Sequence, residues 1–89
     1  MNNYALTIVF KPDTEEKARK EFLDSVKKRV VKVEKEENWG IRDLAYSIKH
    51  HTKGYYVHML FNAEPSSIQE LDKSLKLEED IIRHLLIRV

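Results

Sequence analysis

The sequence of 89 residues contains no cysteine and only two glycines and two prolines. The absence of cysteine excludes a disulfide scaffold and a thiolate metal site, and it fits a reducing cytoplasm. The apolar run from Ala5 to Phe10 is far too short to span a membrane, and residues 1–3 lack the basic region of a signal peptide. We therefore expect a soluble, untargeted chain that forms one domain over residues 1–89 with a small core.

The net charge of +1 does not by itself indicate a nucleic-acid-binding protein. Its distribution is uneven, because residues 64–80 carry six acids and two bases, whereas residues 39–63 carry three bases and one acid. Residues 81–89 add two arginines and no acid. This asymmetry would orient the protein on a polyanion, although a solvated charged surface is the simpler interpretation of the charge alone.

Hydrophobic periodicity divides the chain into six segments. Period-two alternation predicts strands near residues 4–10, 31–49, 55–61 and 81–89, with a bulge near Gly40 in the second. Apolar residues at helical spacing predict helices near 14–28 and 66–76. Asp13 and Glu16 form a possible capping box for the first helix, while Pro65 or Ser67 could begin the second. Residues 50–54 resemble a hairpin turn, in which Gly54 could take a positive φ.

This β-α-β-β-α-β order favours an α+β, ferredoxin-like fold. Hairpin pairing and right-handed crossovers give a four-stranded antiparallel sheet in the order 4-1-3-2, with both helices on one face. The periodic apolar positions predict which side chains the helices cover: Leu6, Ile8, Phe22, Val26, Leu44, Ile48, Val57, Met59, Ile68, Leu71 and Leu75. The fold itself hosts many functions and decides none of them.

Catalytic chemistry is not apparent in the sequence. The loop from Lys11 to Thr14 offers neither glycine nor arginine to cradle a phosphate. His50 and His51 are adjacent and diverge on an extended chain, while His58 and His84 fall on different predicted strands. We expect no enzyme, no metal, no cofactor and no small-molecule substrate.

The most informative stretch follows Trp39. Residues 40–49 read Gly-x-Arg-x-Leu-Ala-Tyr-x-Ile-Lys, and this pattern resembles the signature of the bacterial small-subunit ribosomal protein six family. The similarity extends to Tyr4 before the first strand and to Ile82-Arg83 at the start of the last. The chain departs from the family pattern at Ser47, where proline is common, and at Asn2 and Asn3, where arginines are common.

The resemblance implies a structural component of the small ribosomal subunit in the cytoplasm. Family members pair with small-subunit ribosomal protein eighteen, and the pair binds the central domain of the small-subunit ribosomal RNA. They have no catalytic activity and need no cofactor or membrane. The alternative is a free-standing ferredoxin-like module that dimerises through its sheet or binds a small metabolite.

Two sets of residues follow as candidate contacts. The sheet face away from the helices is expected to expose Ala5, Val9, Ala45 and neighbouring apolar groups, which suggests a protein partner; the predicted partner residues are Trp39, Ile41, Tyr56, His58 and Leu60. Phosphate contacts need accessible bases, and the predicted RNA-binding residues are Arg42, Lys49, His50, Lys53 and Arg88. Solubilising charges on an edge strand would explain the same bases without RNA.

Overall fold

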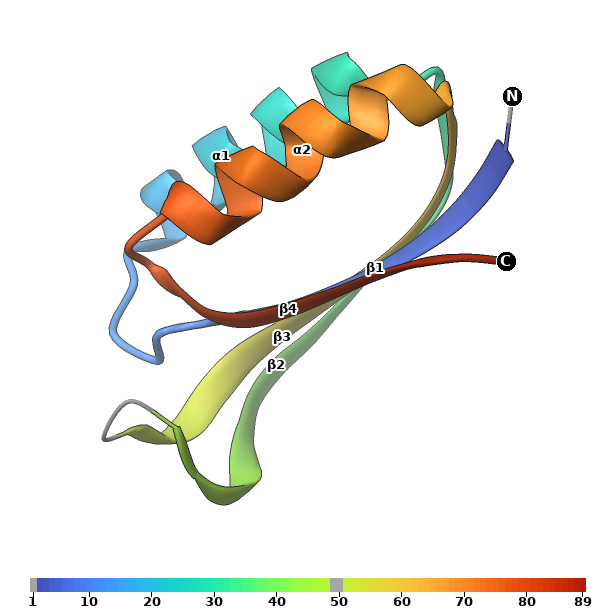
Figure 1. The fold of residues 1–89 in the computed structure, drawn as a ribbon. Coiled ribbons are helices and arrows are strands. Elements are labelled where there is room, and N and C mark those ends of the chain that lie inside the picture. Colours follow the sequence, from blue (N-terminus) through green and yellow to red (C-terminus); the bar gives the residue numbers. More distant parts are fainter. Residues whose placement is uncertain (1, 49–50) are drawn as a thin grey trace.

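Six elements make up the fold of this computed structural model, which describes residues 2–48 and 51–89, with the backbone alone at residues 45–48 and 51. In chain order they are β1 (Asn2–Phe10), α1 (Glu16–Arg29), β2 (Lys32–Ile48), β3 (His51–Ala63), α2 (Pro65–Leu77) and β4 (Ile81–Arg88). The strands form one sheet in the order β2-β3-β1-β4, and every pairing is antiparallel. Both helices cover the same face of this sheet (Figure 1). The predicted ferredoxin-like fold and its 4-1-3-2 order are therefore confirmed.

The core lies between the helices and the two central strands. Period-two alternation in β1 and β3 points Leu6, Ile8, Val57 and Met59 towards the helices, and all four are fully buried. From the helices, Val26, Leu71 and Leu75 meet them, and Phe22 and Ile68 pack partly buried against the same cluster. These nine predicted core positions are confirmed.

The prediction that Leu44 belongs to the core is wrong. It is half-buried and does not belong to the core cluster. Its Cδ2 lies 3.6 Å from the ideal Cβ position of Gly54, so it packs within the β2–β3 hairpin instead of beneath the helices. The side chain of Ile48 lies outside the described residues.

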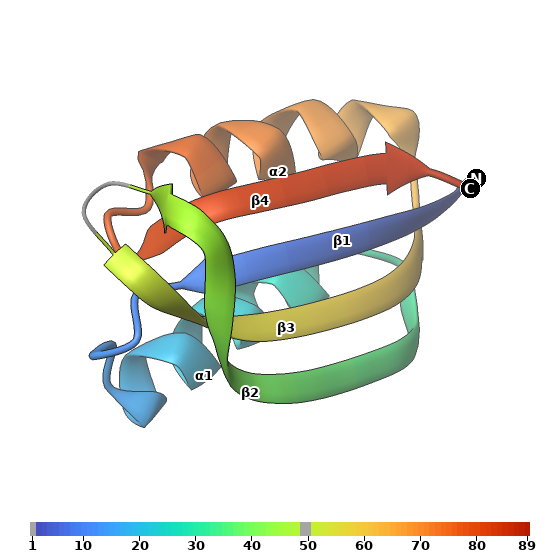
Figure 2. The same ribbon diagram turned by 90° about the horizontal axis from the view of Figure 1, so that it is seen from below.

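The β2–β3 hairpin is longer than the sheet it extends. β2 has 17 residues and β3 has 13, whereas β1 has nine and β4 has eight. The extra length bends to the side of the sheet away from the helices (Figure 1), and from below β2 crosses in front of β3 and β1 (Figure 2). We call the surface of the sheet that faces away from the helices the open face.

Bulges in β2 allow this bend. The pairing register with β3 shifts between Val33 and Lys35, between Asn38 and Gly40, and between Asp43 and Ile48. Gly40 has a φ of 78°, a left-handed conformation that an L side chain rarely adopts, so the predicted bulge is confirmed there. Each bulge increases the local twist and turns the edge strand across the sheet.

Gly54 is needed because a side chain at this position would clash with β1, and not because its backbone has a positive φ. It lies within β3 opposite Arg42, so the expected turn over residues 50–54 is wrong for its described residues 51–54. An ideal Cβ at this position would lie 2.3 Å from Cγ1 of Val9 and 3.5 Å from the carbonyl oxygen of Phe10. Only a residue without Cβ lets the hairpin approach β1 this closely.

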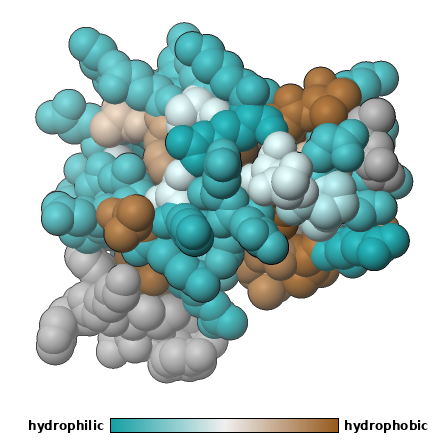
Figure 3. Space-filling model, turned by 45° about the horizontal axis from the view of Figure 1, so that its top comes forward, coloured by the Kyte–Doolittle hydropathy of each residue, from teal (hydrophilic) through white to brown (hydrophobic). Residues whose placement is uncertain are grey.

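The helix ends differ from the predicted caps. Helix α1 begins at Glu16 with Glu15 as its N-cap, and no side chain caps it, so the Asp13–Glu16 capping box is wrong. Helix α2 begins at Pro65 with Glu64 as its N-cap, which favours the proline start over Ser67. The outer surface of the helix layer is largely hydrophilic, with separate apolar patches (Figure 3).

Candidate protein and RNA interface

Three rings form an aromatic stack on the open face: Trp39, Tyr56 and His58. The indole of Trp39 lies 5.3 Å from the ring of His58 and 6.3 Å from that of Tyr56, with interplanar angles of 14° and 20°. Tyr56 and His58 share this face because they are two residues apart on β3. Trp39 reaches them from the bulge at Gly40, which turns the edge strand over its neighbour.

Polar partners fix the orientation of the stack. The indole Nε1–H of Trp39 donates to Oε2 of Glu37 at 2.7 Å, and Nδ1 of His58 is hydrogen-bonded to Oγ1 of Thr7 at 2.9 Å. The Lys35 ammonium lies 2.7 Å from Glu37, and this contact, together with the indole hydrogen bond, lowers the pKa of Glu37. The same contact raises the pKa of Lys35.

Sequence reasoning missed Glu37 and Thr7 as positioning residues. Glu37 could have been predicted, because residues two apart on a strand, such as Glu37 and Trp39, point to the same face. Thr7 is the register partner of His58, and that pairing required the fold.

The open face exposes less of its centre than expected. Ala5 and Val9 are only 8% and 5% exposed, so the expectation that they are exposed is wrong. The bent hairpin covers Val9, because Gly54 lies directly against its side chain. Of the predicted partner residues, Ile41 is half exposed, Trp39 is 37% exposed, and Tyr56, His58 and Leu60 are half-buried. The side chain of Ala45 lies outside the described residues.

Apolar exposure continues instead on β4. Leu85 and Ile87 are 52% and 46% exposed, and they lie on the open face opposite Thr7 and Ala5. This exposure could not be predicted from the sequence, because Leu85, Leu86 and Ile87 are all apolar and do not reveal which face of the strand is buried. The open face therefore has two exposed apolar parts, one at the β2 edge and one on β4.

Two of the predicted RNA-binding residues lie at neighbouring positions of the hairpin but on opposite faces of it, because Arg42 pairs with Gly54 and Lys53 pairs with Asp43. Arg42 and Lys53 are both exposed on its paired strands, and the Arg42 guanidinium lies 5.2 Å from the ring centre of Trp39. Lys49 and His50 lie outside the described residues. Arg88 is exposed but pairs with Tyr4 at the far end of β1, whereas the hairpin extends from the Phe10 end. The fold separates Arg88 from the hairpin bases.

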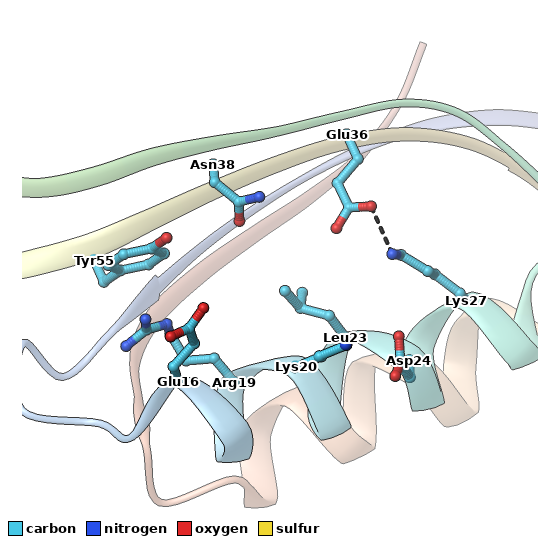
Figure 4. Close-up of a pocket in the computed structure, with 9 residues that line it drawn as sticks. All are labelled: Glu16, Arg19, Lys20, Leu23, Asp24, Lys27, Glu36, Asn38 and Tyr55. Carbon is cyan, nitrogen blue, oxygen red and sulfur yellow. Dashed lines mark ion pairs between the residues drawn. The ribbon is translucent and has the colours of Figure 1, made fainter.

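A polar pocket of about 240 Å³ lies on the opposite side of the sheet, between α1 and the strands β2 and β3. Its lining includes three acids and three bases, and Lys27 pairs with Glu36 at 2.6 Å across its width (Figure 4). Arg19 stacks on the ring of Tyr55 at 3.8 Å. These contacts hold α1 against the edge strand and give the pocket no net charge.

The described residues offer no other obvious chemistry. No group of three or more histidines and carboxylates within 2–44 and 52–89 could hold a metal ion. None of the helices in the part of the chain that the structure describes is long and apolar enough to cross a membrane.

The architecture defines a ferredoxin-like protein whose open sheet face carries an aromatic stack and a basic hairpin. The family model described as Ribosomal protein S6 matches residues 3–88. The chain belongs to this family, as the motif after Trp39 predicted. Membership places it in the small ribosomal subunit of the bacterial cytoplasm.

Individual relatives agree with this assignment. The chain is 39% identical to the small ribosomal subunit protein bS6 of Desulforamulus reducens over 92 residues, covering 99% of this chain and 97% of that one. It is 37% identical to the bS6 protein of Clostridioides difficile, with 98% of each chain covered. Among solved structures, the crystal structure of 30S ribosomal protein S6 from Thermotoga maritima superposes with a TM-score of 0.89 at 28% identity, covering 99% of this chain and 87% of that one.

Proposed function

We propose that this protein is a non-catalytic structural component of the small ribosomal subunit, and that the whole chain acts as one domain. It binds the central domain of the small-subunit ribosomal RNA together with small-subunit ribosomal protein eighteen. The match of the family model to residues 3–88 is the observation that carries this proposal. A near-neutral chain suits a shared interface, since the partner can supply much of the positive charge that RNA requires.

The open face supports the protein contact. Trp39 exposes apolar surface at the β2 edge of this face, and Leu60 lies half-buried on the same face as Tyr56 and His58. Ile41 is half exposed on the same edge strand, but it pairs with Tyr55 and so points to the other side of the sheet. Rigid aromatic rings held by hydrogen bonds need little further ordering when a partner covers them. We assign the partner contact to Trp39, Ile41, Tyr56, His58 and Leu60.

The test of this contact is a charge placed on the open face. Leu60→Glu should abolish co-purification with small-subunit ribosomal protein eighteen, because burying an unpaired carboxylate in an apolar interface is strongly unfavourable. Leu77→Glu is the matched control, since Leu77 is 81% exposed on α2 in the helix layer and should leave co-purification unchanged. Thermal melts check that both variants fold. Co-purification of Leu60→Glu at wild-type yield would place the interface elsewhere.

The hairpin supports the RNA contact. Arg42 and Lys53 are exposed bases on the same arm, and the predicted contacts Lys49 and His50 fall in the same stretch of chain. Replacing Arg42, Lys49 and Lys53 with Gln should weaken binding of the protein pair to ribosomal RNA. The slope of log affinity against log salt should become shallower by roughly one for each lost contact. An unchanged slope would show that the partner alone carries the phosphate contacts.

A further inference from the structure

The outer strand β4 carries an exposed arginine that is not among the predicted RNA-binding residues. Arg83 is the register partner of Val9, so it lies on the open face near the start of β4. No salt bridge joins it to another side chain within the described part of the molecule. Residues 81–89 contain no acid, and the nearest acids in the sequence are Glu78, Glu79 and Asp80, which precede β4.

Two depressions meet at Arg83. One, of about 160 Å³, opens on the open face and is lined by Thr7, Val9, Tyr56, Arg83, His84 and Leu85. The other, of about 300 Å³, lies between α2 and the start of β4 and is lined by Leu75, Lys76, Ile81, Ile82, Arg83 and His84. The strand edge between them is therefore accessible from both sides.

A second base is held beside this edge by Asp72. The Lys76 ammonium lies 2.9 Å from Oδ2 of Asp72, and Nε2 of His84 lies 3.1 Å from Oδ1 of the same carboxylate. Asp72 pairs with Lys76, whereas no carboxylate pairs with Arg83 among the described residues. Arg83 presents a planar fork of donors suited to two oxygens of one phosphate.

The hairpin bases and Arg83 flank the same end of the open face. Arg42 pairs with Gly54, and the ideal Cβ position of Gly54 lies 2.3 Å from Cγ1 of Val9, the register partner of Arg83. The ladder Gly40–Tyr56–Val9–Arg83 crosses the sheet in three steps of about 4.8 Å, or about 14 Å in all. Figures 1 and 2 both show the hairpin at the end of the sheet where β4 begins.

We propose that Arg83, with Lys76 beside it, is a second phosphate-contact site for RNA, so that a strand bound at the hairpin continues across the end of the open face to β4. This inference rests on the proposed RNA-binding function and names a contact that its hairpin residues do not include. Exposed bases on both sides of one face would fix the direction of the RNA backbone as well as its affinity.

The test compares Arg83→Gln with the wild type, each in complex with small-subunit ribosomal protein eighteen. Affinity for an RNA fragment of the central domain is measured over a series of salt concentrations. Arg83→Gln should make the slope of log affinity against log salt shallower by about one, whereas Arg83→Lys should keep the slope because it keeps the charge. Lys28→Gln removes the same charge from an exposed position on α1 and should have no effect.

The outcomes separate this inference from the function on which it rests. A wild-type pair that does not bind the RNA contradicts the proposed function itself. A wild-type pair that binds, with Arg83→Gln matching Lys28→Gln, overturns the inference alone. A loss of affinity with an unchanged slope also overturns it, since Arg83 would then act structurally.

A small phosphorylated ligand is the other possible source of phosphate. Thermal melts of the free protein in inorganic phosphate test it, with chloride at matched ionic strength as the reference. Stabilisation of the wild type but not of Arg83→Gln, without any effect of Arg83 on RNA binding, would assign the edge to such a ligand and overturn the RNA contact.

Discussion

Replacing Gly54 with alanine tests whether the hairpin really closes against β1. The new methyl group would lie 2.3 Å from Cγ1 of Val9, a contact that real Cβ atoms do not make. Val9 is 5% exposed and β-branched, so it cannot rotate away easily. Overpacking of this kind costs about 1–3 kcal/mol, and the lower entropy of the unfolded alanine chain offsets about 0.4–1 kcal/mol of it. We expect a net destabilisation of about 1–2 kcal/mol.

The assay is thermal and urea unfolding of a double-mutant cycle. For a chain of this size each kcal/mol lowers Tm by roughly 4–8 °C. Val9→Ala removes the clashing methyl group, so it should rescue Gly54→Ala and give a favourable coupling energy of about 0.5 kcal/mol or more. Gly40→Ala is the control, because its Cβ would meet nothing within 4 Å and its cost comes from the φ of 78° alone.

Two results would refute the reasoning. Gly54→Ala melting at the wild-type temperature would show that the hairpin is not seated on β1. Equal coupling of Val9→Ala to both glycine variants would show that the loss of stability at Gly54 is a backbone effect and not a clash.

Three further predictions concern stability and the aromatic stack. Leu75→Ala should cost about 2–5 kcal/mol in urea unfolding because Leu75 is fully buried, and Leu44→Ala should cost clearly less; equal losses would return Leu44 to the core. Lys76 and His84 lower the pKa of Asp72, so the stability that wild type gains over Asp72→Asn should be present above the ordinary pKa of 3.8 and disappear as pH falls below it. Glu37→Ala should shift the fluorescence of Trp39, the single tryptophan, to the red and increase its quenching by acrylamide; an unchanged spectrum would mean that Glu37 does not hold the indole.

The order of the elements and most of the core could be read from the sequence. Apolar periodicity identifies the buried faces of β1, β3 and both helices, because burial of one face is what each pattern encodes. The motif from Gly40 to Lys49 also identified the family, because its residues match the family signature at the same spacing. Neither conclusion required knowledge of how distant segments meet.

The contacts of the open face depended on the fold. Trp39 reaches Tyr56 and His58 only because a bulge shifts β2 by one residue, and a bulge changes pairing without changing the apolar pattern. Leu44 alternates like a core residue, yet the bent hairpin places it beside Gly54.

The basic residues likewise separate what the sequence determines from what the fold determines. The sequence determined which residues carry positive charge, but only the strand order decided which of them share a surface. Arg88 lies far along β4 from the hairpin, whereas Arg83, five residues earlier, flanks the same end of the open face as Arg42. Pairing between strands distant in sequence fixes such neighbours, and one-dimensional spacing does not contain it.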